Sequence, residues 1–254
     1  MYRGYNLELK KRYFNKDDDE YYQIGRRLHN KNKKQVKATL ESFISSDFSL
    51  NGSKMQANWF PQIDADIFIS HSHSNEKMAI RLAGWLSHRF NITSFIDSCV
   101  WGYANDLIDM INNEYCLIDK KNRIYDYEKC NYSASHVHMM LSTALTMMID
   151  NTECLFFLNT PESITPSDVI DVTKSPWIYS EVSMTKLIRE KSLKKHRQKK
   201  VLSSYLEELK KAITINYGVD LSHLTILNED LLDIWDVVPC YGNVDSLDVL
   251  YGLT

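Results

Sequence analysis

The segment that begins at Ser175-Pro176 places an aromatic ring and a carboxylate four residues apart, at Trp177 and Glu181. Serine before proline is typical of a helix start, with Ser as the N-cap and Pro in the first turn. Residues four apart on a helix share a face, about one turn from each other. An aromatic surface beside a carboxylate suits a site that grips a planar ring and acts on the attached sugar. Glu181 is therefore the candidate catalytic group, and Trp177 a candidate substrate contact.

Two other groups of polar residues follow predicted strands. The apolar run 66–70 has strand character and precedes the small polar residues 71–75, and a second predicted strand, 92–97, leads into a predicted loop at 98–103. In an open parallel sheet, ligands bind outside the carboxyl ends of the strands. We therefore expect these further residues to contact a substrate: Ser70, His71, Ser72, Asp97, Trp101 and Tyr103.

The elements around these residues predict a layered α/β fold. Apolar residues at helical spacing from 79 to 90 separate the two predicted strands, which gives a β-α-β unit and implies parallel strands covered by helices. The run 154–158 is apolar throughout, which favours a central strand. Further elements are predicted as helices at 107–115, 136–149 and 228–235 and as a weaker strand at 213–217. The whole pattern predicts an open, doubly wound, mostly parallel sheet of the flavodoxin-like kind.

A change of pattern near residue 60 divides the 254-residue chain. Residues 1–60 are polar and predict a helical N-terminal extension, with one or two helices that end near residues 45–52. Residues 61–254 predict the α/β domain, which continues into a C-terminal α/β extension. Within this domain, residues 116–135 are polar and irregular and predict an insertion.

Composition limits the expected partners and compartment. The formal net charge is −3 and the pI about 6.2, so nucleic acid is not an expected partner. No apolar run is long enough to cross a bilayer, and the charged first residues lack the apolar core of a signal peptide. We therefore expect a cytoplasmic protein without a membrane partner. Five cysteines without close pairing predict neither a disulfide framework nor a zinc site.

Each candidate residue also has a plainer interpretation. Glutamates on helices are usually solvated, so Glu181 would then be a surface residue, and Trp177 would pack at a helix start. Asp97 ends a predicted strand, where it would cap the adjoining loop. In a receiver-like fold Asp97 would instead accept a phosphoryl group, but the acidic pair and the lysine of such folds have no counterpart in the pattern.

Two histidine pairs and one basic run were weighed in the same way. His71/His73 and His136/His138 have the spacing of metal ligands, but no cysteine and carboxylate partner stands at ligand spacing, so no metal is expected. The basic run 191–200 has no interleaved aromatic residues and predicts a solvated helix end or a docking face.

Three stretches, in this order, resemble the signature boxes of TIR (Toll/interleukin-1 receptor) domains. Asp66-Ile67-Phe68-Ile69-Ser70-His71-Ser72 resembles the first box, and Phe95-Ile96-Asp97 with the segment that holds Gly102 is similar to the second box and its BB loop. Ser175-Pro176-Trp177-Ile178-Tyr179-Ser180-Glu181 resembles the S-x-W-x-x-x-E stretch of NAD-cleaving TIR domains, with Ile178 where the family usually has Cys. The resemblance spans about residues 64–189, half of the chain.

This resemblance implies a TIR-type fold and an enzyme that cleaves the nicotinamide–ribose bond of NAD, with Glu181 as the catalytic glutamate. NAD is then a substrate, no cofactor is expected, and residues 70–74 would admit the diphosphate. The resemblance also implies homo-oligomers through TIR–TIR contacts, with the segment 98–103 closing a neighbour's pocket. In Thoeris-type antiphage defence, such an enzyme makes an ADP-ribose-derived signalling nucleotide, linear or cyclic, that reaches a separate effector protein.

Other functions fit the same pattern. A non-catalytic TIR module would act by self-association or by binding other TIR domains, and it would need no carboxylate at position 181. A nucleoside deoxyribosyltransferase-like enzyme would share the layered fold and the glutamate chemistry but would act on deoxynucleosides. A structural adaptor would use the N-terminal helices as its binding face.

Overall fold

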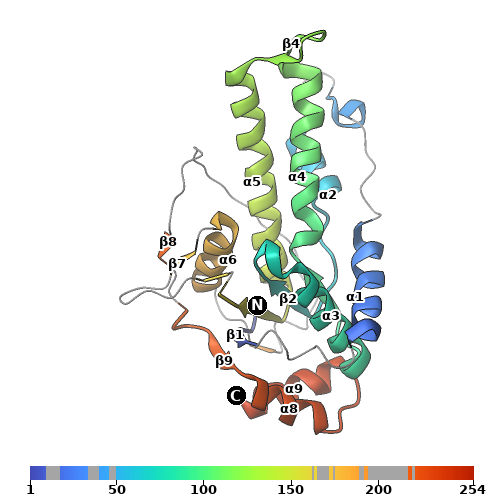
Figure 1. Cartoon of the computed structure of the whole chain (residues 1–254), viewed down its shortest axis with the longest axis vertical. Helices are drawn as coiled ribbons and strands as arrows, with labels where there is room; N and C mark the ends of the chain where they lie inside the picture. Colours follow the sequence, from blue (N-terminus) through green and yellow to red (C-terminus); the bar gives the residue numbers. More distant parts are fainter. Residues whose placement is uncertain are drawn as a thin grey trace.

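The centre of the molecule is a five-stranded parallel sheet with the order β3-β2-β6-β1-β9 (Figure 1). The computed structural model describes residues 1–9, 18–33, 40–45, 50–161, 163–164, 172–173, 175–188, 192–193, 217–218 and 221–254, with the backbone alone at 18–19, 31–33, 99–102, 172, 176 and 217–218. The strands are β1 (Arg3–Glu8), β2 (Ile67–Ser70), β3 (Ser94–Ile96), β6 (Cys154–Asn159) and β9 (Thr225–Leu227). The predicted parallel α/β sheet is confirmed.

The central strand β6 explains why the sheet is covered on both faces. Its first five residues are fully buried, as expected for a strand of a doubly covered sheet. Because successive side chains point to opposite faces, Leu155 and Phe157 enter one apolar cluster, and Phe156 and Leu158 enter another. The strand predicted at 154–158 is therefore confirmed, and it divides the core into two parts.

Helices form the two outer layers. Buried side chains of α2, α4, α5 and α6 join the cluster that holds Phe157, and those of α3, α8 and α9 join the cluster that holds Phe156. The described helices are α1 (Asp18–Lys33), α2 (Gly52–Trp59), α3 (Glu76–Phe90), α4 (Ser98–Ile111), α5 (Tyr127–Asn151), α6 (Pro176–Leu187), α8 (Glu229–Val237) and α9 (Asn243–Leu253). This arrangement is compatible with a flavodoxin-like fold.

Helix α1 lies against α3 at a point where two glycines meet. A Cβ at Gly25 would lie 1.9 Å from the carbonyl oxygen of Ile80, and a Cβ at Gly84 would lie 1.9 Å from that of Tyr21. Only residues without a side chain permit this distance between two helix backbones. The two glycines therefore fix where α1 crosses α3.

The N-terminal segment differs from the expected helical extension. Residues 3–8 form β1, which pairs in parallel with β6 on one side and with β9 on the other (Figure 1). Tyr5 and Leu7 are fully buried in the sheet. The expectation that residues 1–60 are purely helical is wrong at this strand. Among the described residues of this segment, a 3₁₀ turn at Leu40–Phe43 follows α1, and α2 extends to Trp59, beyond the predicted end near residues 45–52.

Helices α4 and α5 rise together from the sheet as a long arm (Figure 1). The loop expected at 98–103 is wrong, because α4 begins at Ser98, directly after β3. The insertion expected at 116–135 is regular: β4 (Leu117–Asp119) and β5 (Ile124–Tyr125) form an antiparallel hairpin at the end of the arm. Helix α5 then starts at Tyr127, nine residues before the predicted start, because Asp126 caps it by accepting a hydrogen bond from the Lys129 N–H.

The C-terminal part adds the edge of the sheet and two helices. The predicted helix 228–235 is confirmed as α8, capped by the Asn228 side chain, which accepts from the Leu231 N–H at 3.0 Å. Most of the strand predicted at 213–217 lies outside the described residues. Tyr217–Gly218 forms β8, which pairs antiparallel with β7 (Val172–Thr173) in a separate small sheet. Within the described ranges, no helix combines the length and apolar character needed to cross a bilayer.

Candidate functional site

Glu181 lies on α6, and the start of this helix is built as its sequence predicts. Ser175 is the N-cap, its Oγ accepts a hydrogen bond from the Ile178 N–H at 3.3 Å, and Pro176 is the first helical residue. Five residues into the helix, Glu181 points inward and is 2% exposed. The interpretation of Glu181 as a solvated surface residue is therefore wrong.

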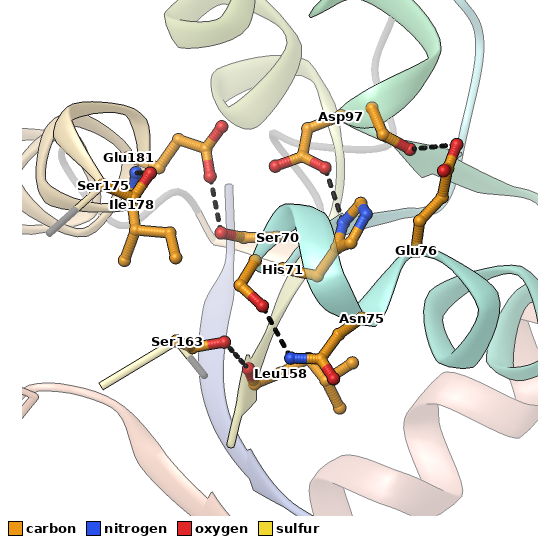
Figure 2. A network of polar contacts seen from close by, with 12 residues as sticks. Ser70, His71, Asn75, Glu76, Asp97, Leu158, Ser163, Ser175, Ile178 and Glu181 are labelled. Carbon is orange, nitrogen blue, oxygen red and sulfur yellow. Dashed lines mark hydrogen bonds and ion pairs between the residues drawn. The ribbon is translucent and has the colours of Figure 1, made fainter. Parts of the chain in front are cut away.

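The carboxyl group of Glu181 meets the end of β2. The Oγ of Ser70, the last residue of that strand, donates a hydrogen bond to Oε2 of Glu181 at 2.5 Å (Figure 2). Ser70 is 1% exposed. Two segments 111 residues apart in the chain therefore meet at the carboxyl end of the sheet, where ligands bind in folds of this kind.

Asp97 completes a buried pair of carboxyl groups. It follows β3, is fully buried, and lies close enough to Glu181 for the two charges to interact. Both oxygens of Asp97 and Oε1 of Glu181 lack a regular hydrogen-bond partner among the described residues. Figure 2 shows the two carboxyl groups turned toward one another beside Ser70 and His71. Nδ1 of His71 lies 2.6 Å from Oδ1 of Asp97, although the contact is not aligned as a regular hydrogen bond. Four predicted site residues are therefore brought together: Ser70, His71, Asp97 and Glu181.

Burial changes the protonation of this cluster. It raises the pKa of Glu181 well above its ordinary value, and the negative charge of Asp97 raises it further. Burial likewise raises the pKa of Asp97, while the polar groups near it, the Glu181 carboxyl group and the backbone N–H groups of Ser98, His71 and Asp97, lower this pKa. Burial lowers the pKa of His71 to about 4, against the attraction of Glu181 and Glu76. At neutral pH, His71 is therefore a neutral imidazole, and burial favours the protonated form of both carboxyl groups.

A further carboxylate lies behind His71. Glu76, at the start of α3, raises the pKa of His71 by its charge. Its Oε1 accepts a hydrogen bond from the Ser98 Oγ at 3.4 Å and lies 3.8 Å from Nε2 of His29, a buried residue of α1. The α1 helix of the N-terminal segment is therefore connected to the cluster through Glu76.

A second buried network joins the ends of β2 and β6, and sequence reasoning missed it. The Nδ2 group of Asn75 donates to Ser72 Oγ and to Thr160 Oγ1, both at 2.6 Å. Thr160 contacts Ser163, whose Oγ donates to the carbonyl of Leu158 (Figure 2). The strand order reverses between β2 and β6, which is where such sheets bind ligands. The available signal was a group of Ser, Thr and Asn residues soon after each of the two strands, within 72–75 and 160–163.

The aromatic candidates are placed less favourably than the polar ones. Tyr103 is buried in the apolar cluster on the face of α4 and α5, and it lies within α4 instead of a loop. Trp177 is half-buried, packs on the same apolar cluster, and has its ring centroid 5.6 Å from that of His138 on α5. The side chain of Trp101 lies outside the described residues. The described contacts therefore place Tyr103 and Trp177 in packing.

The other histidines do not gather into a metal centre in the described part of the chain. His73 is exposed, and His136 contacts the ring of Tyr132 at 4.4 Å between centroids. Within the described ranges, no group of three or more His, Cys, Asp or Glu side chains is arranged to hold a metal ion. The basic run 191–200 lies almost entirely outside the described residues.

The cluster can supply two buried carboxyl groups and a hydroxyl group at the edge of the sheet. A preorganised charge in a site without water stabilises a developing cation more strongly than the same charge in water.

Comparisons of this chain with models of protein families, with curated proteins and with solved structures gave no match in any of the three.

Proposed function

We propose that this chain is a TIR-type enzyme that cleaves the nicotinamide–ribose bond of NAD, with Glu181 as its catalytic carboxyl group. The observation that supports this proposal most directly is the convergence of three chain segments. Ser70, Asp97 and Glu181 come from the three stretches that resemble TIR signature boxes, and they meet in one buried cluster at the carboxyl ends of β2 and β3.

The proposed chemistry follows from the charge of this cluster. Nicotinamide leaves NAD as a neutral molecule, so the bond breaks without a general acid, and the ribose passes through an oxocarbenium-like state. The negative charge of the Asp97–Glu181 pair would stabilise this cation. The N-terminus of α3, directly after residues 72–75, would favour the diphosphate. NAD is the substrate, and the proposed reaction uses no further cofactor.

Access to the cluster requires a rearrangement of the chain. Glu181 and Ser70 are almost completely shielded from solvent, so NAD reaches them only after part of their cover has moved. We therefore propose that activity depends on assembly or on a trigger. The segment 98–103, expected as a loop that closes a neighbour's pocket, forms the first turns of α4.

In this proposal, the product carries the biological signal. An ADP-ribose-derived nucleotide, linear or cyclic, would leave the homo-oligomer and reach a separate effector protein in antiphage defence of the Thoeris type. The proposed compartment is the cytoplasm. The free thiols of Cys116, Cys130, Cys154 and Cys240 fit such a reducing environment.

The main rival function is a non-catalytic interaction module. The end of the α4–α5 arm supports it, because large apolar side chains are exposed there: Tyr115, Ile118, Ile124, Tyr127 and Tyr132. In that case, the buried carboxyl pair would be a structural feature beneath a docking domain.

Incubation of the purified chain with NAD separates the two functions. The enzyme proposal predicts nicotinamide release that increases more steeply than protein concentration, because assembly opens the site. Glu181→Gln preserves the shape of the side chain and should abolish the release, whereas Glu128→Gln, at an exposed glutamate of α5, should not. If nicotinamide release is absent at high concentration while the chain self-associates, the interaction module is the correct function.

A further inference from the structure

We propose that Asp97 and Glu181 share one proton and work as a unit: at rest Glu181 holds the proton and Asp97 the charge, and the proton passes to Asp97 as positive charge develops on the ribose. Asp97 is then a positioning residue that acts through Glu181, in place of the direct substrate contact expected from the sequence. The first half of this inference concerns the resting protein alone. The second half rests on the proposed function.

The geometry requires a shared proton. Both side chains are buried, Figure 2 shows their carboxyl groups turned toward one another, and neither the Asp97 oxygens nor Oε1 of Glu181 has a regular donor among the described residues. Two carboxylates placed in this way without a proton between them would repel. The environment lets neither of them ionise as readily as it would in water. When two acidic groups interact this strongly, the proton belongs to the pair and is lost in steps that describe the pair.

The donors around the two groups decide which one carries the charge. Oδ1 of Asp97 lies 2.6 Å from Nδ1 of the neutral His71, and Asp97 lies at the N-terminus of α4, whose dipole favours a negative charge. Glu181 accepts from the single hydroxyl of Ser70 at Oε2, while no donor among the described residues reaches its Oε1. The ionised form is therefore better stabilised at Asp97, and Oε1 of Glu181 carries the proton.

The other titratable groups nearby support the same assignment. His71 is neutral at pH 7, and a proton on its Nδ1 is the form compatible with the 2.6 Å approach to Asp97 Oδ1. Glu76 lies on the far side of His71, and its Oε1 accepts a hydrogen bond from Ser98 Oγ. Among the described residues, no lysine or arginine pairs with either carboxyl group. The cluster of Ser70, His71, Asp97 and Glu181 thus holds one negative charge.

A shared proton would let the buried pair place its negative charge on Glu181 only while the ribose cation forms, without help from solvent. In the proposed step, the O–H bond of Glu181 breaks, an O–H bond forms at Asp97, and the negative charge moves to the Glu181 oxygen. The charge appears beside the ribose as the C–N bond to nicotinamide lengthens, and the total charge of the pair stays constant. No proton is exchanged with water during this step, and the proton returns to Glu181 once the ribose carbon has bonded to its acceptor.

Infrared spectroscopy of the protein labelled with ¹³C at its glutamate carboxyl groups tests the resting state without any substrate. At pH 7 we expect the band of a protonated glutamic acid, shifted in D₂O, present in the wild type and in Glu128→Gln and absent in Glu181→Gln. Asp97→Asn removes the neighbouring charge and supplies an amide donor, so it should lower the pH at which this band disappears by at least about one unit. A wild type without the band at pH 7, or an unchanged midpoint in Asp97→Asn, would overturn the shared proton.

The kinetic arm separates this inference from the proposed function. If the band is present but NAD is not cleaved, the enzyme proposal fails and the shared proton stands. If NAD is cleaved, Asp97→Asn should lower kcat roughly 10²-fold or more, leave KM nearly unchanged, and shift the pH profile of kcat toward lower pH. Asp97→Asn with a wild-type kcat and pH profile would refute the catalytic role of the proton transfer.

Discussion

Replacing Gly84 with alanine tests the crossing of α1 over α3. The added Cβ would lie 1.9 Å from the carbonyl oxygen of Tyr21 and 2.8 Å from the backbone nitrogen of Gly25, whereas ordinary van der Waals contact begins near 3.4 Å. Both neighbours are backbone atoms of α1, so no side chain can rotate away. The two helices must separate by about 1.5 Å, the difference between 3.4 and 1.9 Å.

The expected cost combines overpacking with a gain in helix propensity. Forcing one extra methyl group into a close contact costs about 1–3 kcal/mol, and the upper part of this range applies because the contact is with backbone. Alanine in place of glycine within a helix returns about 0.5–1 kcal/mol. We therefore expect Gly84→Ala to lower the free energy of unfolding by about 1–2 kcal/mol.

Gly252→Ala is the matched control for this change. Gly252 lies in α9, and a Cβ there would meet no atom within 4 Å. The same substitution should therefore stabilise the protein by about 0.5–1 kcal/mol. Urea unfolding at pH 7, followed by the fluorescence of the buried Trp235, gives both values. If Gly84→Ala is as stable as Gly252→Ala, α1 does not cross α3 at this point.

Three further predictions follow from the site and its surroundings. The pKa of Glu181 is raised in the folded chain, so folding takes up a proton and the unfolding free energy falls as pH rises above the ordinary pKa of 4.5. Urea titrations from pH 5 to 8 should show that Glu181→Gln removes up to about 1.4 kcal/mol per pH unit from this fall. An equal fall in the wild type and in Glu181→Gln would contradict the raised pKa. Asn75→Ala leaves Ser72 and Thr160 without their buried donor and should lower the unfolding free energy by about 1–3 kcal/mol. The control Asn58→Ala removes one exposed hydrogen bond and should lower it by less than about 0.5 kcal/mol. Equal losses in the two variants would argue against the network. Ile118→Ser with Ile124→Ser should reduce self-association, measured by analytical ultracentrifugation, only if the arm end is an interface. Because activity is proposed to depend on assembly, nicotinamide release should fall in the double variant only together with self-association. Release that is lost while self-association is unchanged would contradict a site confined to the sheet edge.

Local signals in the sequence predicted those elements whose formation depends on neighbouring residues. The apolar run 154–158, the helical stripe at 79–90 and the cap at Ser175 all specify structure within a few residues, and all three were found. Strand β1 was missed because Arg3–Glu8 mixes polar and apolar residues, and its burial arises from pairing with strands more than 140 residues away. Pairing between such distant segments leaves no periodic signal in the strand itself.

The candidate site shows the same division. Ser70, Asp97 and Glu181 were predicted to meet because each stands at the carboxyl end of a strand or at the start of a facing helix. The sequence could not predict that they would be closed to solvent, because burial depends on the packing of distant segments. Gly102 favoured a loop after β3, but α4 begins at once and carries Tyr103 into the core. Asn75 was taken as part of a polar loop, although it joins two strand ends.

The central claim is that the carboxyl group of Glu181 acts on the ribose of NAD. It is tested most directly by the rate of nicotinamide release from NAD by the wild type, Glu181→Gln and Glu128→Gln at equal concentrations, with folding verified by circular dichroism. We predict release by the wild type and by Glu128→Gln, and a rate at least roughly 10²-fold lower for Glu181→Gln. Release by Glu181→Gln at the wild-type rate would contradict the account.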